Sequence, residues 1–145
     1  LSGLGSIYVK REDYRIAIEY YKKALVYYKK TTRAPQIQMG YTEVGVTYEK
    51  MGKYKDAAAY LNKSLELNQA QGVGGTNVYG NLMNHFANIS LAKQDYEQAL
   101  TCVNKAMNIE VSPAARKNSF KLLSDIYNQK NDYKKAFYYY YQAHI

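Results

Sequence analysis

The sequence carries few of the side chains that perform catalysis or bind metal ions. Its 145 residues include two histidines, His85 and His144, and one cysteine, Cys102. Neither histidine lies in an H-E-x-x-H pattern, and a lone cysteine cannot supply the pair of thiolates found in many zinc sites. Cys102 has no candidate general base near it in the sequence, so we expect a packed or half-exposed thiol. We therefore predict no catalytic residues, no metal site, no cofactor and no enzymatic activity.

Two other features could bind phosphate groups. Gly74 and Gly75 lie in the flexible stretch 71–76, which lacks the lysine and the preceding strand of a phosphate-binding loop. The formal net charge is +8, and basic residues are enriched between residues 10 and 33. Because these residues alternate with tyrosine and alanine, a solvated helix face explains them better than a nucleic-acid-binding stripe. Nucleic acid binding through the basic first hairpin is kept as the less favoured alternative.

The polar residues that could bind a ligand must be positioned by helices, and the apolar pattern predicts helical hairpins. Apolar residues recur at helical steps on both sides of Gly52, which indicates two helices joined by a tight turn. The pattern recurs around four tyrosines spaced 40, 42 and 37 residues apart: Tyr14, Tyr54, Tyr96 and Tyr133. An alanine follows each of them by three residues: Ala17, Ala57, Ala99 and Ala136. A larger side chain follows by seven: Tyr21, Leu61, Val103 and Tyr140. A small residue precedes each by nine: Gly5, Gly45, Ala87 and Ser124.

This spacing resembles the tetratricopeptide repeat. Three first helices carry its bulky, small and aromatic residues: Leu4-Gly5-Tyr8, Val44-Gly45-Tyr48 and Leu123-Ser124-Tyr127. The third unit departs from the pattern, because Ser90 stands where the aromatic residue is expected. The resemblance implies an all-α fold, a right-handed superhelical array of four antiparallel helix-turn-helix repeats. We expect these repeats at about 1–33, 34–73, 76–110 and 112–145, within a single domain 1–145.

Several residues mark where these helices begin and end. Asp13, Asp95 and Asp132 each precede a hairpin tyrosine and are predicted to accept the unpaired amides of a helix start. We expect Gly52 to end its helix in a left-handed conformation, and Thr76 and Ser112 to cap the helices that follow them. The predicted helices span about 1–10, 14–30, 35–51, 54 to the flexible stretch, 77–93, 96–109, 113–129 and 133–145. Ala57 and Ala99 are expected to lie where paired helices touch.

The resemblance also implies a binding surface. In this family the first helix of each pair lines a concave groove, and two positions, three before and one after the small residue, point into it. Those positions are Ser2, Ser6, Thr42, Val46, Asn84, Asn88, Lys121 and Asp125. Neighbouring inward candidates are Met39, Glu43, Asn81, His85, Asn118 and Asn128. The candidate ligand-binding set is therefore Met39, Thr42, Glu43, Val46, Asn81, Asn84, His85, Asn88, Asn118, Lys121 and Asp125.

Asparagine is the most frequent residue in this candidate set. An asparagine amide both donates and accepts hydrogen bonds, so it can pair with the backbone of an extended peptide without reading its side chains. Asparagine has mediocre helix propensity, so several on one expected face call for a reason. Exposure on a soluble helix remains the alternative explanation. The basic clamp of the chaperone-tail version of this fold is absent, because Ser2, Ser6, Glu43, Asn81 and His85 occupy its places.

Repeats of about 40 residues, the many tyrosines and a closing K-x-x-A-x-x-Y-Y look similar to the sensor segments of bacterial signalling proteins. The leading hypothesis is a non-enzymatic module that binds a peptide or protein segment in its groove, as the sensing or scaffolding part of a larger regulatory protein. A structural assembly or dimerisation spacer is the alternative. No run of about 18 apolar residues occurs, so no membrane insertion is predicted. A cytoplasmic and a periplasmic location both stay open, with the first slightly favoured.

The two ends of the sequence carry further expectations. Leu1 falls inside an expected helix, so we expect this chain to be part of a longer protein. The last helix, 133–145, is aromatic or apolar nearly all round. Ala136, Tyr140 and Ala143 are predicted to pack inside their own hairpin, which leaves Phe137, Tyr138, Tyr141 and Ile145 on other faces. We therefore expect another helix to follow Ile145 in the longer protein, and the isolated chain to self-associate through this end.

Overall fold

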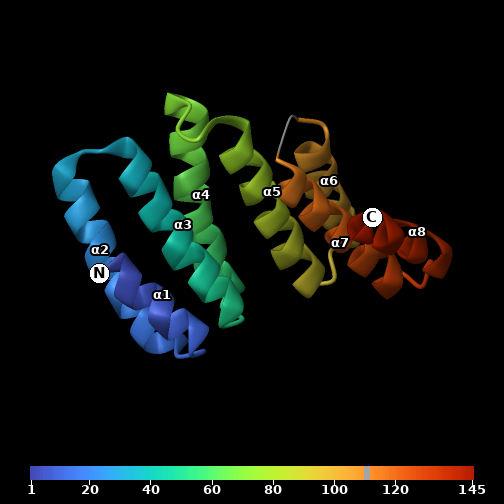
Figure 1. Cartoon of the computed structure of the whole chain (residues 1–145), viewed down its shortest axis with the longest axis horizontal. Coiled ribbons are helices and arrows are strands. Elements are labelled where there is room, and N and C mark those ends of the chain that lie inside the picture. Colours follow the sequence, from blue (N-terminus) through green and yellow to red (C-terminus); the bar gives the residue numbers. More distant parts are fainter. Residues whose placement is uncertain (110–111) are drawn as a thin grey trace. The chain divides into compact units, whose positions relative to one another are not determined.

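The computed structural model describes residues 1–109 and 112–145, which form eight α-helices and no strand (Figure 1). The helices are α1 (Ser2–Lys10), α2 (Tyr14–Thr31), α3 (Ala34–Lys50), α4 (Tyr54–Gln71), α5 (Gly75–Ala92), α6 (Tyr96–Met107), α7 (Pro113–Gln129) and α8 (Tyr133–His144). The all-α prediction is confirmed. The repeat boundary predicted at residue 110 lies outside the described residues.

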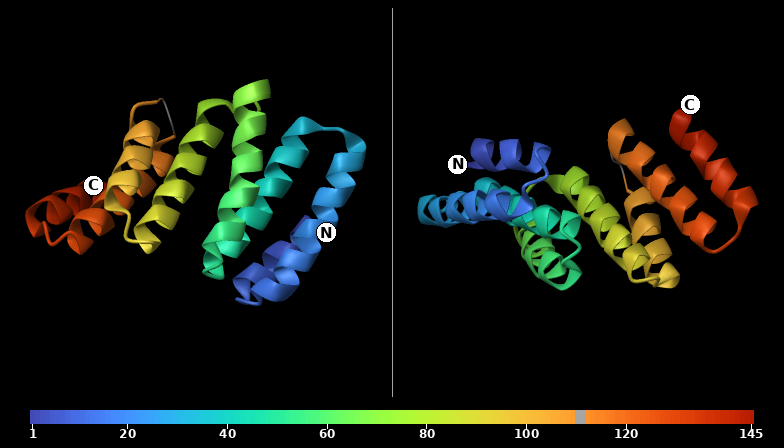
Figure 2. Two further views of the ribbon diagram at one scale, coloured as in Figure 1. Left: turned by 180° about the vertical axis from the view of Figure 1, so that it is seen from behind. Right: turned by 90° about the horizontal axis from the view of Figure 1, so that it is seen from below.

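The helices form two compact units, Leu1–Val73 and Gly74–Ile145, and each unit is described by itself. In the first unit α1 contacts α2, α2 contacts α3, and α3 contacts α4. In the second unit α5 contacts α6, α6 contacts α7, α7 contacts α8, and the two first helices α5 and α7 also touch. The views in Figure 2 show each unit as two antiparallel helical hairpins.

The same turn joins the two helices of every hairpin. Four residues have positive φ at equivalent places: Glu12 (61°), Gly52 (76°), Gln94 (62°) and Asn131 (64°). In each turn the backbone N–H of the residue after the positive-φ residue donates to the carbonyl five residues before it, as Lys53 does to Tyr48 at 3.0 Å. This bond and the left-handed residue are the features of a Schellman cap. The left-handed conformation predicted for Gly52 is confirmed, and three other residue types adopt it as well.

The helix starts follow the predictions in three places and differ in two. Asp95, Asp132 and Ser112 each accept a hydrogen bond from a backbone amide of the following helix, as predicted. Asp13 occupies the N-cap position but makes no such bond. The prediction that Thr76 caps α5 is wrong. Gly74 takes the N-cap position with a φ of 80°, and the helix begins at Gly75.

Close approach of paired helices depends on small residues opposite large ones. A Cβ added to Gly45 would lie 2.8 Å from Cγ of Leu61, and one added to Gly5 would lie 2.7 Å from the Tyr21 ring. Ala57 and Ala99 are fully buried, as expected for residues at helix contacts. The core of the first unit gathers around Ala17, Ile18, Tyr21, Leu25 and Val44, and that of the second around Ala87, Leu91, Ala99, Cys102, Val103, Leu123 and Ile126.

The packing of α8 differs from the prediction at one residue. Ala136 and Ala143 are buried and Phe137, Tyr138, Tyr141 and Ile145 are exposed, as expected, but Tyr140 is 56% exposed. Tyr139 packs instead, stacked on Tyr127 with ring centroids 5.7 Å apart. The repeat template was misleading here because Tyr21 and Val103, the equivalents of Tyr140, lie in clusters with the first helix of the following hairpin. No helix lies against Tyr140 in this way among the described residues.

Within the described part of the chain, none of the helices combines the length and the apolar character needed to cross a lipid bilayer.

Candidate peptide-binding surfaces

The second unit presents two neighbouring stripes of polar residues on its first helices. On α5, Asn81, His85 and Asn88 follow one another at steps of 4 and 3 residues, and both asparagines are exposed. On α7, the exposed residues Asn118, Lys121, Asp125 and Asn128 have the same spacing. Helices α5 and α7 are in direct contact, so the two stripes adjoin. We call these seven residues the amide surface.

Asn84 does not belong to this surface, and the expectation that it is exposed is wrong. Its side chain is 8% exposed and lies between α5 and α7. Its Oδ1 accepts a hydrogen bond from Ser119 Oγ at 2.9 Å, and its Nδ2 donates to the Ala115 carbonyl at 3.4 Å. A buried amide satisfied in this way ties the two helices together. Asn84 therefore positions the amide surface and has no exposed face to offer a ligand.

The predicted groove residues of the first unit are more enclosed. Met39 is exposed, whereas Thr42, Glu43 and Val46 are half-buried on α3. Thr42 Oγ1 lies 2.8 Å from Ser64 Oγ, and Gln38 Nε2 donates to both hydroxyls, at 2.9 and 2.6 Å. These polar groups therefore largely satisfy one another.

Glu43 connects α3 to α1. The Ser2 hydroxyl donates to Glu43 Oε2 at 3.0 Å, so these two predicted groove residues come together. Burial raises the pKa of the Glu43 carboxyl, while the Ser2 hydrogen bond lowers it by a smaller amount. In the second unit, burial also raises the pKa of Asp125.

The residues three positions before the small residue of each first helix mostly form hydrogen bonds within the protein. Ser2, Thr42 and Asn84 all bond to other parts of their unit, whereas Lys121 is exposed. The positions one after the small residue are more open, since Ser6, Asn88 and Asp125 are exposed and Val46 is half-buried. Of the predicted set, the exposed members suited to direct contact are Met39, Asn81, Asn88, Asn118, Lys121 and Asp125.

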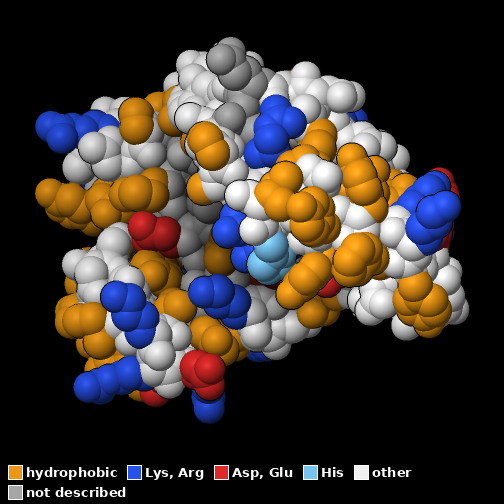
Figure 3. Space-filling view, turned by 45° about the vertical axis from the view of Figure 1, so that its right-hand side comes forward, with side chains coloured by type: hydrophobic (Ala, Val, Ile, Leu, Met, Phe, Trp, Pro, Cys, Tyr) orange, Lys and Arg blue, Asp and Glu red, His pale blue; other side chains and the backbone are white. Residues whose placement is uncertain are grey.

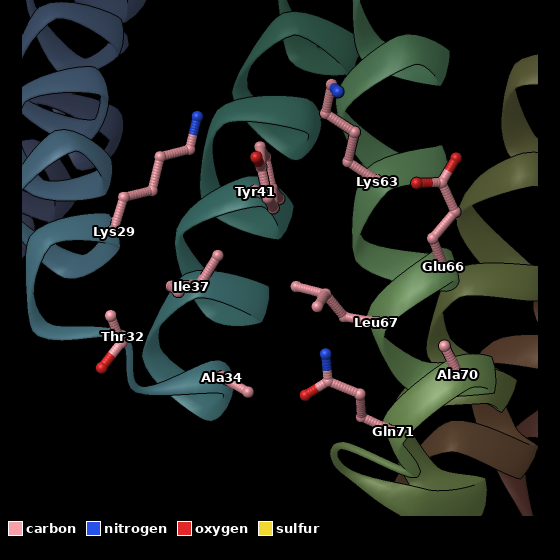
Figure 4. Close-up of a pocket in the computed structure, with 10 residues that line it drawn as sticks. All are labelled: Lys29, Thr32, Ala34, Ile37, Tyr41, Lys63, Glu66, Leu67, Ala70 and Gln71. Atoms are coloured by element: carbon pink, nitrogen blue, oxygen red, sulfur yellow. The ribbon is translucent and has the colours of Figure 1, made fainter.

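Sequence reasoning missed a hollow on the other side of α3. It lies between α2, α3 and α4 and has a volume of about 530 Å³ (Figure 4). It is lined by Lys29, Thr32, Ala34, Ile37, Tyr41, Lys63, Glu66, Leu67, Ala70 and Gln71. The only sequence signal was the combination of lysine and tyrosine in the first half of the chain, which does not reveal how three helices enclose a space.

Cys102 and His144, whose side-chain types can take part in catalysis, both pack against other side chains in the structure. Cys102 is buried in the core of the second unit, and burial raises the pKa of its thiol. A thiol with a raised pKa is a poor nucleophile at neutral pH. His144 stacks on Tyr140 with ring centroids 4.2 Å apart. The described residues contain no group of three or more histidine, cysteine or acidic side chains that could hold a metal ion.

Comparison with known proteins agrees with this fold. Residues 1–70 match the tetratricopeptide repeat family. The crystal structure of BtubC (BKLC) from P. vanneervenii is similar in fold, with a TM-score of 0.78 and 19% sequence identity over 98% of this chain. The match covers 59% of that chain, so the present sequence spans less than two thirds of its length. None of the curated proteins matches the sequence.

The recognition of tetratricopeptide repeats in the sequence is confirmed, since the matched residues consist of such repeats and the whole chain has a helical-repeat fold. Proteins with these repeats generally mediate protein–protein interaction or act as scaffolds, and the fold is typically non-enzymatic. The partners of this chain are therefore to be sought among proteins.

Proposed function

We propose that this chain is a peptide- or protein-segment-binding module that uses the first helices of its hairpins, as the sensing or scaffolding part of a larger signalling or regulatory protein. The observation that carries the proposal is the amide surface of α5 and α7. Two adjoining helices expose asparagines there in regular stripes, and the buried Asn84–Ser119 pair fixes their relative position.

The chemistry of the amide surface suits an extended backbone. Asn81, Asn118 and Asn128 each expose a carbonyl oxygen and an NH₂ group, so each can pair with a peptide N–H and C=O at once. Main-chain pairing of this kind gives affinity with little dependence on the peptide's side chains. Lys121 and Asp125 add one charge of each sign on α7, which favours a partner that carries both.

The first test is a binding measurement with a selected peptide. Peptides displayed on phage would be selected on the intact chain, and the dissociation constant of the tightest one measured by calorimetry. Replacing Asn81 and Asn118 together with alanine should weaken binding about tenfold or more, because two pairs of backbone hydrogen bonds are lost. The fold should be unaffected, since exposed helical asparagine gains helix propensity when replaced by alanine.

Two exposed asparagines on second helices provide the matched control. Asn62 on α4 and Asn104 on α6 are exposed, and replacing both with alanine should leave the dissociation constant unchanged. Equal affinity of the two double variants for the selected peptide would refute the amide surface as its binding site.

A second candidate function, assembly through α8, rests on a separate observation. In α2, the residues 4, 7 and 11 positions after the hairpin tyrosine are Ile18, Tyr21 and Leu25, all buried in one cluster with Val44 of α3. Their equivalents in α8, listed in the same order, are Phe137, Tyr140 and His144, and all three are exposed. Figure 3 turns α8 toward the viewer and shows many hydrophobic side chains on that surface. Leu4 of α1, the equivalent of Val44, is also exposed, so α1 of a second copy has the residues to cover α8.

Assembly of this kind predicts concentration-dependent association. Sedimentation velocity should show the average mass rising with concentration, because a head-to-tail contact leaves α1 and α8 uncovered at the two ends of any assembly that has not closed into a ring. Phe137→Lys with Tyr140→Lys should abolish the growth, whereas Tyr141→Lys, which lies off the covered positions, should preserve it. A wild-type chain that stays monomeric at millimolar concentration would rule assembly out.

A further inference from the structure

The hollow between α2, α3 and α4 lies on the other side of α3 from the predicted groove residues of that helix. Successive residues of an α-helix are rotated by 100°, so Ala34, Ile37 and Tyr41 point to nearly the opposite side of α3 from Met39, Glu43 and Val46. The hollow is lined from the second helices α2 and α4, with α3 as its floor (Figure 4). All its lining residues belong to the first unit.

One half of the hollow is basic and aromatic. Figure 4 shows Lys29 of α2 and Lys63 of α4 on either side of Tyr41. The Lys29 ammonium lies 5.1 Å from the centroid of the Tyr41 ring, and that of Lys63 lies 5.9 Å from it. Neither lysine has a carboxylate within 4 Å in the part of the chain that the structure describes. The ring therefore holds two ammonium groups at the opening without neutralising them.

The other half is apolar. Ile37 and Leu67 face one another across the floor, with Ala34 and Ala70 beside them (Figure 4). Both larger side chains are half-buried, so a guest side chain seated between them would cover apolar surface that water now touches. A hollow of about 530 Å³ has the size of a small ligand pocket. A hollow with a basic half and an apolar half suits a ligand that carries both negative charge and an apolar group.

We propose that this hollow is a second binding site, which takes an acidic peptide segment of a partner protein. Carboxylates of the segment pair with Lys29 and Lys63, and an adjacent large apolar side chain lies between Ile37 and Leu67. Charge complementarity selects the partner, because two lysines without counter-ions attract carboxylates. Glu66 also lines the hollow, so its lining carries a net charge of +1, which suits one or two carboxylates better than a strand of phosphates. Tyr41 already has an ammonium on either side, so its ring faces are not open for a nucleic-acid base to stack on.

The test uses blocked tetrapeptides and the intact chain, with binding measured by isothermal titration calorimetry. The probe is acetyl-Glu-Glu-Leu-Leu-amide, and its comparison peptides replace both glutamates with glutamine or both leucines with glycine. The glutamate-leucine peptide should bind saturably, and each replacement should weaken it about fivefold or more. Its affinity should fall as salt is added, because the paired charges are at the surface.

Matched variants locate the binding. Lys29→Ala with Lys63→Ala should weaken the probe about fivefold or more, whereas Lys30→Ala with Lys55→Ala removes the same charge outside the hollow and should change it less than twofold. Ala70→Phe, an exposed position on the apolar side, should block binding sterically.

Three results would overturn the proposal: no saturable binding of the probe, equal binding of the glutamine peptide, or equal effects of the two lysine pairs. Tighter binding of a single-stranded oligonucleotide that is lost in the Lys29/Lys63 variant would assign the hollow to nucleic acid instead, and so overturn it too. Asn81→Ala with Asn118→Ala should not affect the probe, so this test and that of the amide surface fail separately.

Discussion

Replacing Gly45 with alanine is expected to destabilise the protein by about 1–3 kcal/mol, as overpacking of a tight core does. The added Cβ would lie 2.8 Å from Leu61 Cγ and 3.2 Å from the Ala57 carbonyl oxygen, and Leu61 is fully buried. The Leu61 side chain cannot move aside into solvent, so α3 and α4 must move apart to make room for the added methyl group. Urea unfolding followed by circular dichroism would measure the change in unfolding free energy.

A second substitution tests the cause. The third hairpin carries Ala87 and Val103 at the positions of Gly45 and Leu61, and both are fully buried. Leu61→Val should therefore cost less in the Gly45→Ala background than in the wild type, giving a favourable coupling in a double-mutant cycle. Gly3→Ala is the control, because nothing lies within 4 Å of a Cβ added there. If Gly45→Ala and Gly3→Ala change the unfolding free energy by the same amount, the close packing of α3 against α4 at Gly45 is contradicted.

Replacing Asn84 with alanine should also destabilise the protein, by about 1–3 kcal/mol. The substitution removes the acceptor of the Ser119 hydroxyl and the donor to the Ala115 carbonyl, both in a buried site between α5 and α7. Ser119 retains a longer contact of 3.3 Å to the Ala115 carbonyl, which moderates the loss. The same unfolding measurement applies.

Asn81→Ala is the matched control for this prediction. Asn81 is exposed on the same helix, so its replacement should change the stability by less than about 0.5 kcal/mol. A urea unfolding curve for Asn84→Ala that matches that of the wild type would contradict the structural role assigned to Asn84. Because that role is structural, a binding defect in an Asn84 variant would not by itself identify a ligand contact.

The sequence predicted the helices and their hairpins well because both depend on local signals. Apolar residues at helical steps, small residues at fixed places and the glycine at residue 52 recur within about 40 residues of one another. The caps at Asp95, Ser112 and Asp132 were equally local. Each of these features can be recognised without knowing what lies on the other side of the helix.

The failures share a different origin. The exposure of Asn84 was misjudged because its partner, Ser119, lies 35 residues away in the next hairpin. Tyr140 fits the template for a buried residue, yet burial at that position also needs a further helix against it. The hollow around Tyr41 depends on three helices at once. Contacts between hairpins, rather than within them, decide these features, and a single repeat does not encode them.

The amide surface can be tested most directly by mapping the selected peptide onto the intact, ¹⁵N-labelled chain by nuclear magnetic resonance. The proposal predicts that the amide signals of α5 and α7 around Asn81, Asn88, Asn118, Lys121 and Asp125 shift saturably with peptide. Signals of the second helices α6 and α8 should change little. Shifts concentrated on the second helices, with α5 and α7 unchanged, would contradict the proposal that the first helices form the binding surface.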